Sequence, residues 1–190
     1  MARTAGRTAE ATKQQILDAA TQLISRHGTT APMTDIAAAA GVSKGGLLYH
    51  YPSKQALLAG VATEVMEQFR RDVEQAATEE PPGTPGRLTR AYIRVSFTHA
   101  SDLPGLRDDI ALAAHLMFEP GLEDIARADA AQWRQDLSQD GLDPAATRMV
   151  IAATDGSNSA PLWGAVLSDA DRDALESDLL DLTRPEGTPR

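Results

Sequence analysis

Apolar residues recur at helical spacing along most of the chain, and this pattern limits the possible folds more than any other feature. The first clear stripe occupies positions i, i+3, i+4, i+7 and i+8 of one helical face, namely Ile16, Ala19, Ala20, Leu23 and Ile24. Aromatic residues form only 4% of the 190 residues, and β-branched residues are scattered, which disfavours strands. The sequence therefore predicts an all-α protein.

Proline, glycine and capping residues divide the chain into about nine predicted helices. The first three cover Ala9–His27, Met33–Ala40 with Pro32 at its first position, and Ser43–Tyr49. The fourth begins after Ser53 and continues to about Val73, before the loop 79–86. Five more are expected over 85–100, 104–117, 121–139, 144–158 and 169–183, with N-caps at Thr84, Asp143 and Ser168 and a bend at Pro161. We expect a domain over residues 1–52, a second over 53–190, and a disordered tail from about 184.

Charge is distributed unevenly between the two ends of the chain. The formal net charge is −9, yet residues 1–55 hold six basic and three acidic residues, a charge of +3. A basic N-terminal region on an acidic body is typical of a protein that meets nucleic acid phosphates at one end. The first region is therefore the candidate for DNA binding.

The absence of cysteine excludes a disulfide scaffold, a thiolate zinc site and a cysteine nucleophile. No apolar segment follows the basic N-terminus as in a signal peptide, and no apolar run is long enough to span a membrane. We expect a cytoplasmic protein that needs no cofactor or metal and has no membrane partner.

The segment Thr34–Lys54, TDIAAAAGVSKGGLLYHYPSK, has the pattern of a helix-turn-helix. Such a motif needs small residues where its helices cross, a glycine at the turn and apolar residues that fix the angle between the helices. Gly41 can supply the turn, while Ile36, Val42 and Leu47 can supply the apolar contact. Ser43 would cap the second helix of the pair, whose N-terminal end enters the major groove of DNA in this motif.

Three runs in this segment resemble the helix-turn-helix signature of the tetracycline-repressor (TetR) family: Asp35–Ala37, Gly41–Gly45 and Tyr49–Lys54. The resemblance implies an N-terminal three-helix DNA-binding domain and a C-terminal helical domain that dimerises and binds a ligand. It also implies a homodimeric repressor that a small-molecule effector releases from a pseudo-palindromic double-stranded operator. The residues that it places at the DNA are Thr34, Ser43, Lys44, Gly45, Tyr49, His50 and Lys54. Arg3 and Arg7 would form either a minor-groove arm or a disordered tail.

The expected second domain, residues 53–190, contains most of the aromatic residues, which would either line an effector pocket or pack in the core. Our first candidates for the pocket are Tyr92, His99, His115 and Trp133, and the effector is expected to be apolar or amphipathic. For dimerisation, the last two helices offer small and apolar residues suited to close helix pairing: Ala145, Ala146, Ala152, Ala153, Gly156, Leu175, Leu179 and Leu182.

Two other functions fit parts of the sequence. An enzyme would use His99, His115, Asp108 and Asp109 as metal ligands or as an acid/base set, although their spacing matches no known ligand signature. A chromosome-organising protein with the same fold would bind DNA at many sites without an effector. We expect a regulator and not an enzyme, because the sequence has no P-loop, dinucleotide fingerprint or nucleophile elbow.

Overall fold

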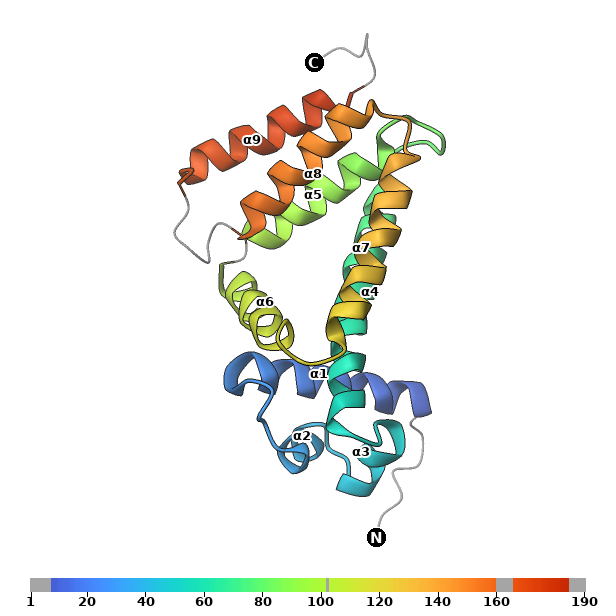
Figure 1. Ribbon diagram of the computed structural model, residues 1–190, viewed down its shortest axis with the longest axis vertical. Coiled ribbons are helices and arrows are strands. Elements are labelled where there is room, and N and C mark those ends of the chain that lie inside the picture. The colour runs from blue at the N-terminus through green and yellow to red at the C-terminus, as the bar shows by residue number, and fades with distance from the viewer. Residues whose placement is uncertain (1–7, 102, 160–165, 185–190) are drawn as a thin grey trace. The chain divides into compact units, whose positions relative to one another are not determined.

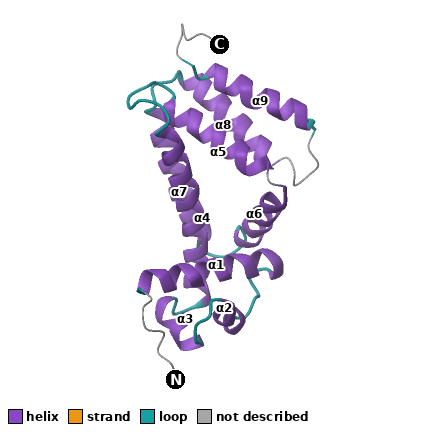
Figure 2. Cartoon of the chain, turned by 180° about the vertical axis from the view of Figure 1, so that it is seen from behind, coloured by secondary structure: helices purple, strands orange, loops and turns teal. Residues whose placement is uncertain are grey.

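The computed structural model describes residues 8–101, 103–159 and 166–184, and within these ranges it contains helices and no strand (Figures 1 and 2). The helices are α1 Ala9–His27, α2 Met33–Ala39, α3 Lys44–His50, α4 Lys54–Ala77, α5 Arg87–Ser101, α6 Leu103–Leu116, α7 Leu122–Ser138, α8 Pro144–Ser159 and α9 Asp169–Leu182. The predicted all-α class is confirmed. The expectations for Arg3, Arg7, Pro161 and the tail after Arg184 fall outside the described residues.

Local capping residues account for several helix starts. The Ser43 hydroxyl accepts a hydrogen bond from the Gly46 N–H at 3.0 Å, and Asp143 accepts from the Ala145 N–H at 2.8 Å. Ser168 and Asp171 form a capping box at the start of α9. These interactions confirm the caps predicted at Ser43, Asp143 and Ser168.

Two predicted helix starts were wrong. Pro32 is the N-cap of α2 and not its first residue, because its ψ of 141° keeps it extended. Thr84 does not cap the fifth helix, since α5 begins three residues later at Arg87. Its first turn is capped instead by the distant Asp140, whose carboxylate accepts hydrogen bonds from the N–H groups of Leu88 at 3.1 Å and Thr89 at 2.7 Å.

The chain forms two compact units, and the first combines residues up to Met66 with Arg107–Ala126. This unit therefore extends past residue 52 and includes α6. The core of this unit contains apolar side chains of α1, α2, α3, α4 and α6: Ile16, Ile24, Ile36, Leu47, Leu57, Leu112 and Leu116. The recognition part of the chain and α6 thus share one core.

Tyr51, directly after α3, packs against Gly60 of α4 in this core. The Tyr51 side chain is buried, and burial raises the pKa of its hydroxyl to about 12. A Cβ atom on Gly60 would lie only 2.6 Å from Cε1 of Tyr51 and 3.3 Å from Cδ2 of Leu17. Glycine at position 60 is therefore what allows the ring to lie against α4.

We expect Gly60→Ala to lower the free energy of unfolding by about 1–2 kcal/mol, because the strain of overpacking exceeds the gain in helix propensity. Gly45→Ala is the matched control, since a Cβ there would come no closer than 4.0 Å to any other atom. That control should leave stability unchanged or raise it. Urea denaturation of both variants measures the difference, and a Gly60→Ala protein as stable as the control would contradict the packing argument.

The second compact unit combines Glu67–Leu106 with Arg127–Arg190. Helices α5, α8 and α9 lie side by side in it (Figure 1), and Ile93, Phe97, Val150 and Leu179 form their shared core. A second cluster contains Val73 of α4 with apolar residues of α5 and α7.

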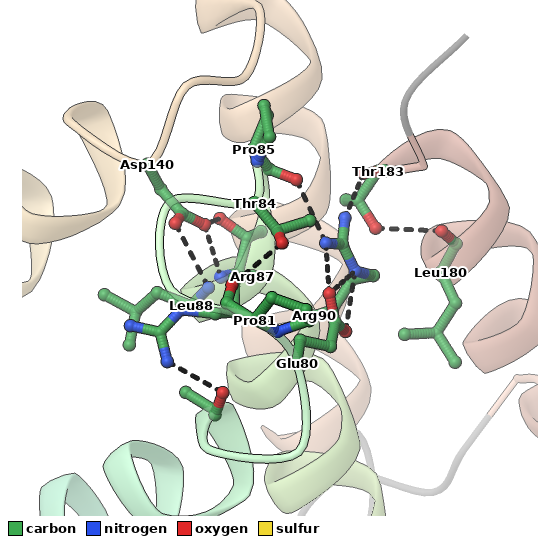
Figure 3. Close-up of polar contacts among 12 residues, drawn as sticks. Glu80, Pro81, Thr84, Pro85, Arg87, Leu88, Arg90, Asp140, Leu180 and Thr183 are labelled. Atoms are coloured by element: carbon green, nitrogen blue, oxygen red, sulfur yellow. Dashed lines mark hydrogen bonds and ion pairs between the residues drawn. The ribbon is translucent and has the colours of Figure 1, made fainter. Parts of the chain in front are cut away.

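A buried arginine ties three distant parts of this unit together (Figure 3). Arg90 of α5 is 4% exposed, and its Nε donates a hydrogen bond to Oε1 of Glu80 at 2.9 Å. The same guanidinium donates to the carbonyl oxygens of Pro85 at 3.0 Å and of Thr183, directly after α9. Arg94 also pairs with Glu80, at 3.1 Å. The Arg90 guanidinium thus connects the loop after α4, helix α5 and the end of α9 through charge-assisted hydrogen bonds.

Candidate DNA interface and ligand pockets

Helices α2 and α3 form a compact helix-turn-helix. Gly41 has a φ of +65°, a left-handed conformation that favours glycine, and the Val42 N–H donates to the Ala37 carbonyl at 2.9 Å across the turn. Ile36 and Leu47 are fully buried, which confirms their predicted place in the apolar contact between the helices. The angle between α2 and α3 is therefore fixed by packing.

Most of the predicted DNA-binding residues lie at the surface. Ser43, Lys44 and Gly45 are exposed at the start of α3, and the Tyr49 side chain is 83% exposed near its end. Thr34 is exposed near the start of α2, where its hydroxyl donates to Asp35 at 3.1 Å. An aromatic side chain with this exposure does not pack in the core, so Tyr49 is available to contact another molecule.

The other two predicted residues, His50 and Lys54, are only partly exposed. His50 is half-buried, and its ring stands edge-on to that of Tyr49 at 5.2 Å between centroids. Lys54 donates from Nζ to the Ala31 carbonyl, directly before α2, and burial lowers the pKa of its ammonium group. The neighbouring Gln55 donates from Nε2 to the Pro120 carbonyl in the turn after α6. The start of α4 thus contacts both the helix-turn-helix and the turn between α6 and α7.

The structure brings two of the four predicted effector residues together, in the second unit. Tyr92 and Trp133 contact each other at 5.3 Å between ring centroids, and Phe69 lies against both. The Tyr92 hydroxyl donates to Asp155 at 2.7 Å, and burial together with this bond raises its pKa. Arg70 lies over the Trp133 ring at 4.1 Å. The rings of Phe69, Tyr92 and Trp133 pack against one another, as the side chains of a hydrophobic core do.

The two histidines of that set belong to two different helices, α5 and α6. His115 belongs to the first unit, where a Cβ on Gly28 at the end of α1 would lie 3.3 Å from its ring. His99 lies in α5, and its side chain is outside the described part of the chain. Of the four predicted residues, the structure thus describes a contact between Tyr92 and Trp133.

Among the pockets of the described residues, one lies in each unit and has a volume of several hundred cubic ångströms, as follows. The pocket beside Trp133 measures about 530 Å³ and has a mostly charged and polar lining that includes Arg70, Gln132 and Asp136. Its arginine already pairs with Asp136 at 2.7 Å. The other pocket measures about 380 Å³, is lined mainly by apolar residues of α4, α6 and the start of α7, and lies within the first unit.

Sequence reasoning missed the apolar pocket. The available signal was the spacing of Asp109, Leu112, Ala113 and Leu116, which places them on one face of α6. No group of three or more potential metal ligands gathers in the part of the chain that the structure describes. None of the helices described is long and apolar enough to cross a membrane.

An exposed second helix on a rigid turn, with a lysine at its N-terminal end, defines a helix-turn-helix DNA-binding protein. Residues 16–61 match the model of bacterial regulatory proteins of the tetR family, and residues 86–184 match that of the tetracyclin repressor-like C-terminal domain. The chain belongs to the TetR family of bacterial transcriptional regulators. The family predicted from residues 34–54 is thereby confirmed.

Individual relatives agree with this assignment. The HTH-type transcriptional repressor LfrR of Mycolicibacterium smegmatis is 38% identical over 86 residues, which cover 45% of this chain and 42% of LfrR. The chain spans less than half the length of this curated relative. A transcriptional regulator from Pseudomonas aeruginosa PAO1 has the same fold, with a TM-score of 0.69 at 22% identity, over 96% of this chain and 98% of that one. The multidrug binding protein EbrR complexed with ethidium gives 0.63 at 23% identity, over 90% and 97%.

Proposed function

We propose that this chain is a homodimeric transcriptional repressor that binds a pseudo-palindromic operator and leaves it when a small molecule binds. The observation that carries the proposal is the exposed surface of α3, with Lys44 at its start and Tyr49 near its end, on a turn fixed by the buried Ile36 and Leu47. A helix held in this way can enter the major groove without first becoming ordered.

The proposed contacts follow from the exposure of each side chain. Lys44 reaches a phosphate or a guanine edge, and Ser43 and Thr34 contact phosphates. Gly45 presents no side chain and lets the helix backbone approach the DNA closely. Tyr49 and His50 lie along the wall of the groove. Lys54 donates one of its three N–H groups to the Ala31 carbonyl and contacts the phosphate backbone with another.

Dimerisation is proposed through α8 and α9. Four positions on α8 at spacings of four, three and four residues are exposed and small or apolar: Ala145, Met149, Ala152 and Gly156. Leu182 of α9 is 45% exposed, whereas Leu179 is buried in the core of its own unit. Such a stripe suits close packing of two helices, and a two-fold axis would place two α3 helices on half-sites roughly 34–36 Å apart.

The effector is proposed to be a small apolar or amphipathic molecule, and no catalysis is involved. Support comes from relatives: LfrR is a repressor, and EbrR binds drugs and has been solved with ethidium. The pocket beside Trp133 and the apolar pocket of the first unit have volumes within the range of small-molecule sites, ~300–1,000 Å³. The site of action is the bacterial cytoplasm, because the chromosome lies there.

Fluorescence anisotropy of the full chain on the DNA upstream of its own gene, in a series of salt concentrations, tests the proposal. Tight binding that prefers this DNA to a scrambled control, weakens steeply with salt and uses an even number of chains per site would support a dimeric regulator. Absence of binding to either DNA at low salt would overturn it.

A further inference from the structure

We propose that Leu48 of α3 reads the C5-methyl group of thymine in the major groove, a step that rests on the proposed function of α3 as the DNA-binding helix. The Leu48 side chain is 37% exposed, whereas that of the preceding Leu47 is fully buried. Among the described residues of the first unit, neither the core nor the partly buried side chains packed against it include Leu48. Its apolar surface is therefore available to contact another molecule.

The neighbours of Leu48 place it on the outer face of α3. Lys44 and Leu48 are four positions apart, so they share one face of the helix. Helical side chains lean over the residues three and four positions earlier, which here are Gly45 and Lys44. A Cβ atom on Gly45 would find its nearest neighbour, the Ser43 hydroxyl oxygen, 4.0 Å away. Because position 45 has no side chain, the outward surface of Leu48 stays uncovered on that side.

The chemistry of leucine selects one group on the DNA. Its side chain has no hydrogen-bond donor or acceptor, so it cannot bind a phosphate oxygen or a polar base atom. A polar base atom covered by leucine would lose water without gaining a partner, which costs free energy. The C5-methyl group of thymine is the apolar group that base edges present in the major groove. Leu48 therefore favours thymine over the other three bases at the position that it covers.

Leu48 would supply a kind of recognition that the other proposed contacts lack. Contacts from Ser43 and Thr34 to phosphates position the protein and carry no direct sequence information. A contact to a methyl group depends on the identity of one base pair and neutralises no phosphate. Loss of this contact should therefore weaken binding without changing how steeply the affinity falls with salt.

Duplexes that the full chain selects from a random-sequence pool test the contact when they are remade with deoxyuridine in place of thymidine. Uracil differs from thymine only by the missing C5-methyl group. One buried methyl group is worth about fourfold in affinity, so a dimer with one contact in each half-site should lose about fifteenfold. Bromodeoxyuridine restores an apolar group of similar size at C5 and should restore the affinity. Fluorescence anisotropy in a series of salt concentrations measures each duplex.

Variants assign the effect to Leu48. Leu48→Ala should bind the thymine and uracil duplexes equally, with about the affinity of the parent for uracil DNA. Leu48→Met keeps a large apolar side chain and should still prefer thymine. The control Phe118→Ala removes an 82% exposed apolar side chain after α6 of the same unit and should discriminate as the parent does. Thermal unfolding should show that all three variants are folded, because neither position packs in the core.

Replacing the thymines by uracil one at a time locates the contact. A loss confined to one or two thymines in each half-site supports it, whereas a loss spread evenly over all thymines would indicate a change in DNA flexibility and overturn it. Equal affinity of the parent for both duplexes, or a Leu48→Ala protein that still prefers thymine, would overturn the role of Leu48 and leave the repressor proposal standing. A selection that enriches no sequence would overturn the repressor proposal and this role together.

Discussion

Replacing Lys44 with alanine is expected to abolish operator binding at protein concentrations where the parent is fully bound. A lysine contact to a base edge or a phosphate is worth ~1–3 kcal/mol, and a dimer loses it twice, so the combined loss is about 2–6 kcal/mol. The fold should be unaffected, because Lys44 is exposed and α3 is capped by Ser43. Anisotropy on operator DNA measures the loss, and thermal unfolding confirms the fold.

The control for this variant is Lys13→Ala, which removes an equal charge from the first unit. Lys13 is an exposed residue of α1 that pairs with Glu10 at 3.9 Å, and it lies outside the proposed interface. It should change affinity only through the general effect of charge. If Lys44→Ala binds the operator as Lys13→Ala does, Lys44 is not a DNA contact.

Replacing the buried Arg90 with methionine is expected to lower the free energy of unfolding by about 3–5 kcal/mol. The substitution leaves the Glu80 carboxylate with Arg94 alone and removes the donors to the carbonyl oxygens of Pro85 and Thr183. Arg94→Met is the comparison, because this side chain is 36% exposed and its loss should cost about 1 kcal/mol or less. Urea denaturation of both variants ranks the two arginines, and equal losses would contradict the central role of Arg90.

The same network predicts how stability responds to acid. Hydrogen bonds from Arg90, more than those from Arg94, hold the pKa of Glu80 below its ordinary value. A carboxylate with a lowered pKa in the folded state stabilises fully above its unfolded pKa, roughly 4.3, and loses that contribution as the pH falls through its folded pKa. As the pH falls below the unfolded pKa of Glu80, the free energy of unfolding of the Arg90→Met protein should therefore decrease less than that of the parent.

The features that the sequence could predict depend on residues near one another in the chain. The stripe from Ile16 to Ile24, the cap at Ser43 and the buried Leu47 each follow from local spacing, and the structure confirms them. The family resemblance rests on the same short segment. Periodicity and capping describe a helix and its ends, and they hold whatever the helix packs against.

The features that escaped prediction depend on residues far apart in the chain. Asp140 caps α5 across more than fifty positions, and nothing near Arg87 in the sequence indicates it. His115 lies beside Gly28 at the end of α1, because α6 packs in the first unit. The apolar pocket exists for the same reason, since its walls meet only when α6 returns to α4. Local patterns carry no information about such pairings.

The shared core of α3 and α6 also determines how this regulator can be recombined with others. Leu112 and Leu116 come from the half of the chain that matches the C-terminal family model, yet they are buried with Leu47 and Leu57 of the helix-turn-helix region. A fragment ending at Met66 would lack part of its own core and should be prone to aggregate. A chimaera that keeps this operator specificity but takes its sensor from a homologue would need to retain Arg107–Ala126, and so would require three crossovers in the gene instead of one.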